Sequence, residues 1–137
     1  MPVLTSAADV ATRRLPKVFT ADAHHAADYL LAGSFIAAGA WFWRRNRRAA
    51  LASWISAGSL LGLTMLTSYP GRNRRYLAFP LHGKIETGMA AMVAAMPEFL
   101  RLEDDKERHF FTVKAGLLTV ISNLTSFSER PSSRNRR

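Results

Sequence analysis

Apolar residues fall into four blocks of about 20 positions, and charged residues gather between the blocks. The blocks cover residues 22–43, 49–69, 80–100 and 109–128, and residues 29–43 contain no charge at all. A helix of about 20 residues is long enough to cross the ~30 Å apolar core of a bilayer. A soluble bundle would instead show a charged face along each helix. The pattern therefore predicts four α-helices that cross a membrane.

One stretch of the chain occurs twice. Residues 57–69 and 115–127 align without a gap at an offset of 58, and the first block shares six residues with the second: Ala57, Gly58, Leu60, Leu66, Thr67 and Ser68. Chance would give about one identity over such a length, so the alignment indicates a duplication. The fold expected from it is two tandem helical hairpins related by a pseudo-twofold axis along the bilayer normal.

These observations predict an all-α, integral membrane four-helix bundle. We expect an N-terminal arm over residues 1–21, a helical domain over 22–128 with repeats at 22–69 and 80–127, and a basic tail over 129–137.

The net charge of +9 does not indicate a nucleic-acid protein. Basic residues are not interleaved with aromatic ones as they are at nucleic-acid sites. Arginine clusters beside apolar spans instead contact lipid phosphates, and the residues expected to do so are Arg44, Arg45, Arg47, Arg48, Arg72, Arg74 and Arg75. The predicted partners are the lipid bilayer and other membrane-protein subunits. The absence of cysteine excludes disulfides and thiolate chemistry.

Four spans place both termini on one side of the membrane. That side carries ten Arg and Lys residues and the other side seven, which favours cytoplasmic termini in a multi-pass protein of the inner membrane. The compact RRNRR turn at 44–48 argues for the opposite orientation.

Small residues are expected to bring the helices together, because helices in lipid associate through close backbone packing. The candidates for these contacts are Gly33, Ala37, Gly58, Gly62, Ala91, Ala95 and Gly116. Their spacing predicts that the first and third helices meet across the pseudo-axis.

Two polar pairs are related by the repeat. His24 and Asp28 lie four residues apart on one helix face, and the offset of 58 carries them onto His82 and Glu86. The preferred interpretation is that both pairs satisfy backbone groups in the first turn of their helices or contact lipid headgroups, without a ligand. It assigns no metal ligand and no catalytic residue. The alternatives are a metal or proton site, and haem or pigment ligation by His24, His25 or His82.

This chain resembles the SPW-repeat membrane proteins in two features. One is an acidic residue four positions after a histidine at the start of an apolar helix, and the other is the repeated AG…LTS segment. The SPW-repeat proteins are small bacterial proteins built from duplicated two-helix units. The likeness covers residues from about 22 to 128, but the Ser-Pro-Trp signature itself is missing. Met96-Pro97-Glu98-Phe99 stands near its expected place in the second copy, and Gly39-Ala40-Trp41 in the first. The resemblance implies the fold and supplies no activity.

The predicted function is that of a small non-catalytic membrane subunit or scaffold that packs against larger partners, such as an accessory subunit of a respiratory or photosynthetic complex. The loops are too short to build an enclosed active site, so we do not expect an enzyme. Two alternatives stay open, namely a carrier of a His-ligated haem or chlorophyll-type pigment, and a small proton-coupled transporter with Asp28 and Glu86 as proton sites. The sequence names no cofactor.

Overall fold

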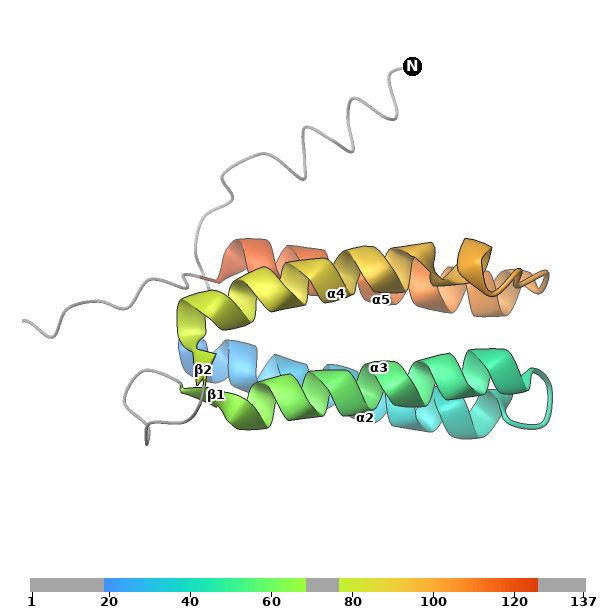
Figure 1. The fold of residues 1–137 in the computed structure, drawn as a ribbon, viewed down its shortest axis with the longest axis horizontal. Coiled ribbons are helices and arrows are strands. Elements are labelled where there is room, and N and C mark those ends of the chain that lie inside the picture. The colour runs from blue at the N-terminus through green and yellow to red at the C-terminus, as the bar shows by residue number, and fades with distance from the viewer. Residues whose placement is uncertain (1–18, 69–76, 126–137) are drawn as a thin grey trace, which may run out of the picture.

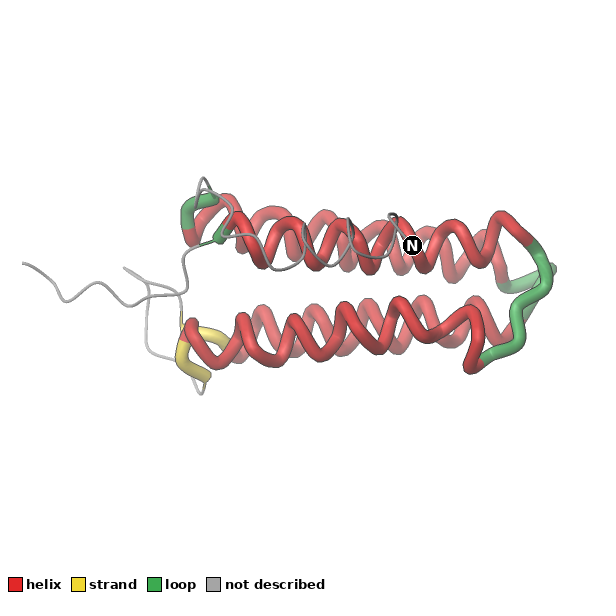
Figure 2. The backbone as a smooth tube through the Cα atoms, turned by 90° about the horizontal axis from the view of Figure 1, so that it is seen from above, coloured by secondary structure: helices red, strands yellow, loops and turns green. Residues whose placement is uncertain are grey.

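The computed structural model describes residues 19–68 and 77–125, which contain four long helices. They are α2 (Ala21–Phe42), α3 (Arg47–Leu66), α4 (Phe79–Phe99) and α5 (Asp105–Leu124). The helices α2 and α3 form one hairpin, α4 and α5 form the other, and the two hairpins lie side by side (Figures 1 and 2). The all-α prediction is confirmed. The predicted arm up to residue 18 and the tail lie outside the described residues.

Side chains just before the helices account for three of the four starts. Thr20, Asn46 and Asp104 each accept a hydrogen bond from a backbone N–H of the turn that follows, which satisfies donors that have no partner inside the helix. The helix α4 lacks such a bond and carries Pro80 in its first turn, where a missing N–H costs nothing.

Short parallel pairings join the two repeats at one end of the molecule. The strand β1 (Thr67–Ser68) pairs with β2 (Leu77–Ala78), and a single bridge joins Phe19 to Thr125. The offset of 58 carries Phe19 onto the first residue of β2 and the first residue of β1 onto Thr125. The same contact is therefore made twice, each time between the end of one repeat and the start of the other.

The predicted contacts through small residues are not where we expected them. The helix α2 packs along α3, and α4 packs along α5, whereas α2 and α4 do not pack along their length. A Cβ added at any of four of the predicted glycines would meet nothing within 4 Å: Gly33, Gly58, Gly62 and Gly116. Ala37, Ala91 and Ala95 are also exposed. These small faces point away from the bundle because large side chains, among them Phe35, Leu60 and Phe111, fill its interior.

Length and mean hydropathy single out one helix as a candidate membrane span. Within the described ranges, only α3 passes this criterion. The helix α2 carries Asp22, His24, His25 and Asp28, which lower its mean hydropathy.

One glycine does permit a close approach. Gly39 of α2 lies beneath the indole ring of Trp54 on α3, and a Cβ at this position would lie 2.2 Å from the indole nitrogen. That nitrogen donates a hydrogen bond of 3.1 Å to the carbonyl of Ile36. An indole ring is rigid, so it cannot yield to an added methyl group without losing this bond.

We predict that Gly39→Ala destabilises the protein by about 1–3 kcal/mol, because overpacking forces the indole away from α2. The matched control is Gly33→Ala on the same helix, where the added Cβ meets open space and the gain in helix propensity is about 0.5–1 kcal/mol. Denaturant unfolding of both variants, followed by circular dichroism, makes the comparison. Equal stability of the two variants would contradict the described packing.

Candidate functional site

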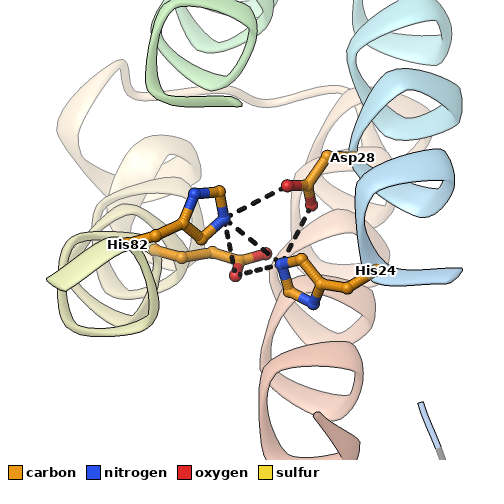
Figure 3. Close-up of side chains that lie close together, drawn as sticks. His24, Asp28 and His82 are labelled. Atoms are coloured by element: carbon orange, nitrogen blue, oxygen red, sulfur yellow. Dashed lines mark hydrogen bonds and ion pairs between the residues drawn. The ribbon is translucent and has the colours of Figure 1, made fainter. Parts of the chain in front are cut away.

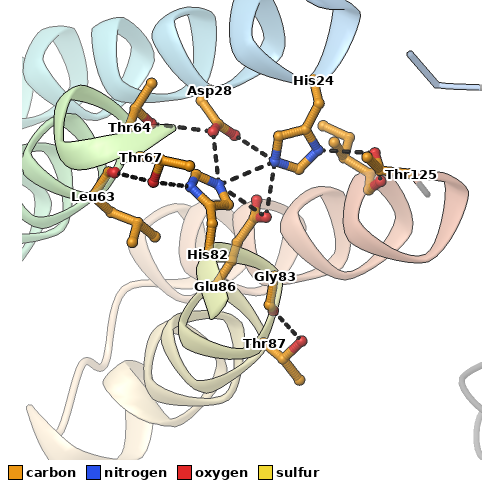
Figure 4. Close-up of polar contacts among 11 residues, drawn as sticks. His24, Asp28, Leu63, Thr64, Thr67, His82, Gly83, Glu86, Thr87 and Thr125 are labelled. Carbon is orange, nitrogen blue, oxygen red and sulfur yellow. Dashed lines mark hydrogen bonds and ion pairs between the residues drawn. The ribbon is translucent and has the colours of Figure 1, made fainter. Parts of the chain in front are cut away.

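Four polar side chains meet between the two repeats. His24 and Asp28 come from α2, and His82 and Glu86 come from α4, so each repeat supplies one imidazole and one carboxylate (Figures 3 and 4). All four residues are 0% exposed. One nitrogen or oxygen atom from each of them lies within 4.8 Å of the others. Buried polar side chains therefore meet between α2 and α4.

The shorter contacts in this cluster cross from one repeat to the other. His24 Nε2 lies 3.0 Å from Glu86 Oε2, and His82 Nε2 lies 3.1 Å from Asp28 Oδ2. Within one helix, the corresponding distances are 3.4 Å from His24 Nε2 to Asp28 Oδ1 and 3.6 Å from His82 Nε2 to Glu86 Oε2. The two Nε2 atoms are 3.2 Å apart. Each histidine therefore lies closer to the carboxylate of the other repeat than to its own.

Two threonines hold the outer nitrogens of the imidazoles, again across the repeats (Figure 4). Thr125 Oγ1 lies 2.8 Å from His24 Nδ1, and Thr67 Oγ1 lies 2.8 Å from His82 Nδ1. Each hydroxyl donates its single proton to a carbonyl of its own helix, at 2.7 Å for Thr125 and 2.6 Å for Thr67. Both threonine oxygens must then accept from the imidazoles, so both Nδ1 atoms carry a proton. The Nε2 atoms face the centre of the cluster.

Further contacts orient the carboxylates and cover the rings. Thr64 Oγ1 donates a hydrogen bond of 3.1 Å to Asp28 Oδ2. Phe79, which is 1% exposed, has its ring centroid 6.0 Å from each of the imidazoles of His24 and His82. Glu86 Oε1 is buried and makes no hydrogen bond among the described residues. The cluster is thus enclosed by protein, with one carboxylate oxygen that points at no donor.

The preferred interpretation of these pairs from sequence was wrong. We expected them to satisfy backbone groups at the helix ends or to contact headgroups. The hydroxyl of Thr20 caps α2 instead, and all four side chains turn inward. The error arose because position along a helix gives the depth of a residue but not the direction of its side chain.

The remaining candidates lie elsewhere. His25 is half-buried and packs its ring against Tyr29, at 4.8 Å between centroids, so it does not join His24 and His82. With their Nε2 atoms 3.2 Å apart and enclosed, these two histidines leave no room for a macrocycle between them. Arg44, Arg45, Arg47 and Arg48 are exposed at or beside the turn between α2 and α3, and their contact with lipid headgroups stays a prediction. Arg72, Arg74 and Arg75 fall outside the described residues.

A second polar contact joins the hairpins near the middle of the helices. Lys114 of α5 donates a hydrogen bond of 2.7 Å to Ser34 of α2 and lies 5.4 Å from the ring centroid of Phe110. At the far end, Asn46 donates a hydrogen bond of 2.9 Å to Glu107. Neither contact has a counterpart under the repeat, since Lys114 aligns with Ser56 and Glu107 aligns with Ala49.

No protein family, curated protein or solved structure matches this chain in the comparisons made. The functional argument therefore depends on the geometry of the chain itself, and the resemblance to SPW-repeat proteins stays a prediction.

We predict that Glu86→Gln destabilises the fold by about 3–5 kcal/mol, because it removes one charge from a buried set and leaves its partners uncompensated. Chemical unfolding measures the change. Glu98→Gln serves as the control on the same helix. Its carboxylate pairs with Arg108 at the surface, and such exposed pairs contribute about 0–1 kcal/mol. Similar losses for the two variants would mean that the Glu86 carboxylate is not buried among charges.

Proposed function

We propose that this protein is a four-span integral membrane protein that acts as a non-catalytic scaffold or subunit. The observation that carries the proposal is the nature of the outward-facing residues. Within residues 26–41, 51–66, 85–95 and 112–120 of the described helices, no exposed side chain is charged. Lys84, one residue before the third of these ranges, is exposed, and Lys114 is half-buried. A water-soluble bundle places its charges on this surface.

Large apolar side chains are exposed on all four helices. Leu30 is 76% exposed on α2, Ile55 is 60% exposed on α3, and Met92 and Leu117 are 43% and 42% exposed on α4 and α5. The hydroxyls of Thr87 and Thr112, which lie among these residues, bond to carbonyls of their own helices. Such a surface, with large exposed apolar side chains on every helix, suits hydrocarbon rather than water.

The helices α2, α4 and α5 all fall short of the criterion for a membrane span. For α2 and α4, the buried polar cluster makes this result compatible with the proposal. Hydropathy averages count His24, Asp28, His82 and Glu86 as if they faced the surroundings, yet all four side chains are enclosed by protein. Ionisable residues inside membrane proteins usually face the bundle interior in this way.

Aromatic and basic residues gather at the turn between α2 and α3, at the end of the bundle away from the polar cluster. The guanidinium of Arg45 lies 5.5 Å from the ring centroid of Trp41, and that of Arg47 lies 4.9 Å from Trp43. Tryptophan and arginine together are typical of the headgroup level, where an apolar ring and a charge meet water and phosphate.

Two features support a scaffolding role, namely the enclosed polar cluster and the small residues exposed on the helix surfaces. The polar cluster is closed off from any substrate, whereas small residues such as Gly33, Ala37, Ala91 and Ala95 are exposed on the helix faces. Faces of this kind let neighbouring transmembrane helices approach closely. We propose other membrane subunits, in respiratory or photosynthetic complexes of the inner membrane, as the partners.

We predict that Ile55→Lys blocks membrane insertion or destabilises the inserted protein by about 2.5–3.5 kcal/mol, the cost of a lysine at the middle of a span. Phe99→Lys is the control, because Phe99 is 81% exposed at the end of α4, where a lysine reaches the headgroups. Alkaline extraction of membranes measures the fraction retained. If Ile55→Lys is harmless, Ile55 faces water and the membrane proposal falls.

The absence of cysteine allows a direct test of orientation. With both termini cytoplasmic, a single cysteine in place of exposed Arg45 reacts with an impermeant maleimide added to intact spheroplasts. A single cysteine in place of exposed Thr20 reacts only after lysis. The reverse labelling pattern would place the termini outside, and equal labelling of both sites in intact cells would contradict four spans.

A further inference from the structure

We propose that His24, Asp28, His82 and Glu86 bind one divalent transition-metal ion, such as Zn²⁺, between the two repeats. This inference goes beyond the scaffolding role and does not depend on the membrane. It replaces the expectation from sequence that these residues hold no metal.

The distances in the cluster match the edges of a tetrahedral site. Zinc binds imidazole nitrogen and carboxylate oxygen at about 2.0–2.2 Å, which sets a separation of about 3.3–3.6 Å between the ligand atoms of a regular tetrahedron. The contacts from the two Nε2 atoms to each other and to the carboxylate oxygens span 3.0–3.6 Å, with the two contacts to Asp28 ending on different oxygens. One ligand atom from each of the four residues lies within 4.8 Å of the others. One ion at the centre would therefore lie within bonding distance of all four residues after small side-chain adjustments.

The hydrogen bonds around the cluster direct the correct nitrogens inward. Because Thr125 and Thr67 hold the Nδ1 protons, a neutral imidazole at either position presents the lone pair of Nε2 to the centre. Metal-binding histidines are usually fixed by such a bond from their second nitrogen. Without a metal ion, each imidazole would have to carry a second proton on Nε2 to pair with the carboxylate of the other repeat, at 3.0 Å and 3.1 Å. A metal ion would take the place of both protons.

Charge and donor type narrow the choice of ion. Two carboxylates bring two negative charges into a buried space, and one divalent cation balances them. Two imidazoles with two carboxylates favour zinc and its neighbours, whereas calcium and magnesium require mainly oxygen ligands in larger numbers. Four protein ligands leave no open position, which is the arrangement of structural rather than catalytic zinc.

The ion would also join the repeats, because each hairpin supplies two of the four ligands. The two hairpins contact each other far less than the helices within each hairpin do, so a shared ion would contribute much of their association.

The experiment uses the full chain, purified without a histidine tag, stripped with a chelator and titrated with Co²⁺ as an optical probe. We expect one Co²⁺ per chain, visible absorption of the intensity typical of tetrahedral cobalt, and displacement by one equivalent of Zn²⁺. X-ray absorption of the zinc-loaded protein should show four nitrogen and oxygen neighbours at about 2.0–2.1 Å.

Substitutions inside and outside the cluster test whether the ion binds to these four residues. His82→Gln should abolish the cobalt spectrum, while His25→Gln, a change in a histidine outside the cluster, should preserve it. Thr67→Val tests the site without touching a ligand and should weaken binding about 10–100-fold, whereas Thr67→Ser, which keeps the hydroxyl, should restore it.

Two results would overturn the proposal. One is a folded wild-type chain that binds neither Co²⁺ nor Zn²⁺. The other is binding that survives both His82→Gln and Thr67→Val, which would indicate an adventitious ion only. Failure of the membrane proposal is a separate outcome, because a chain that stays soluble after ultracentrifugation and still binds cobalt through His82 refutes the membrane location and supports the metal site.

Discussion

Burial of two imidazoles and two carboxylates between the repeats is the constraint on which the rest of this structure depends. Such groups are costly to remove from water unless each is paired, so the two hairpins must come together in the one register that pairs them. The crossed contacts meet this requirement. His24 lies against Glu86 and Thr125, and His82 lies against Asp28 and Thr67, so neither repeat completes its own polar group.

The duplication explains why the arrangement is nearly symmetric. The short parallel pairings, the threonine hydrogen bonds and the crossed ion pairs all repeat at the offset of 58. At the cluster itself, the hydrogen bond from Thr64 to Asp28 has no counterpart between Ser122 and Glu86. Away from the cluster, Lys114 and Glu107 occur in the second copy alone. The cluster end therefore preserves the contacts common to both copies, while the middle and the far end have diverged.

The helices and the repeat could be predicted from sequence because both are visible as patterns along the chain. Four apolar blocks of helical length gave elements whose limits agree with the structure to within about four residues. The pairing of His24 with Asp28, and of His82 with Glu86, was also visible from spacing. What spacing could not give is which way each pair faces, since this depends on how the hairpins pack. Thr67 and Thr125 were noticed as repeated residues, but their role requires the histidine of the other copy to be close. The predicted helix contacts through small residues were wrong. A GxxxG spacing places two glycines on one face of a helix, but it does not say whether another helix packs against that face.

The central claim is that His24 and Glu86, from different repeats, interact directly in a buried site. A double-mutant cycle of His24→Gln and Glu86→Gln, measured by unfolding, tests it most directly. The account predicts that the double variant loses less stability than the sum of the single variants, with a coupling of about 0.5–3 kcal/mol. Additive losses would show that the two side chains do not meet, and the crossed arrangement of the repeats would be wrong.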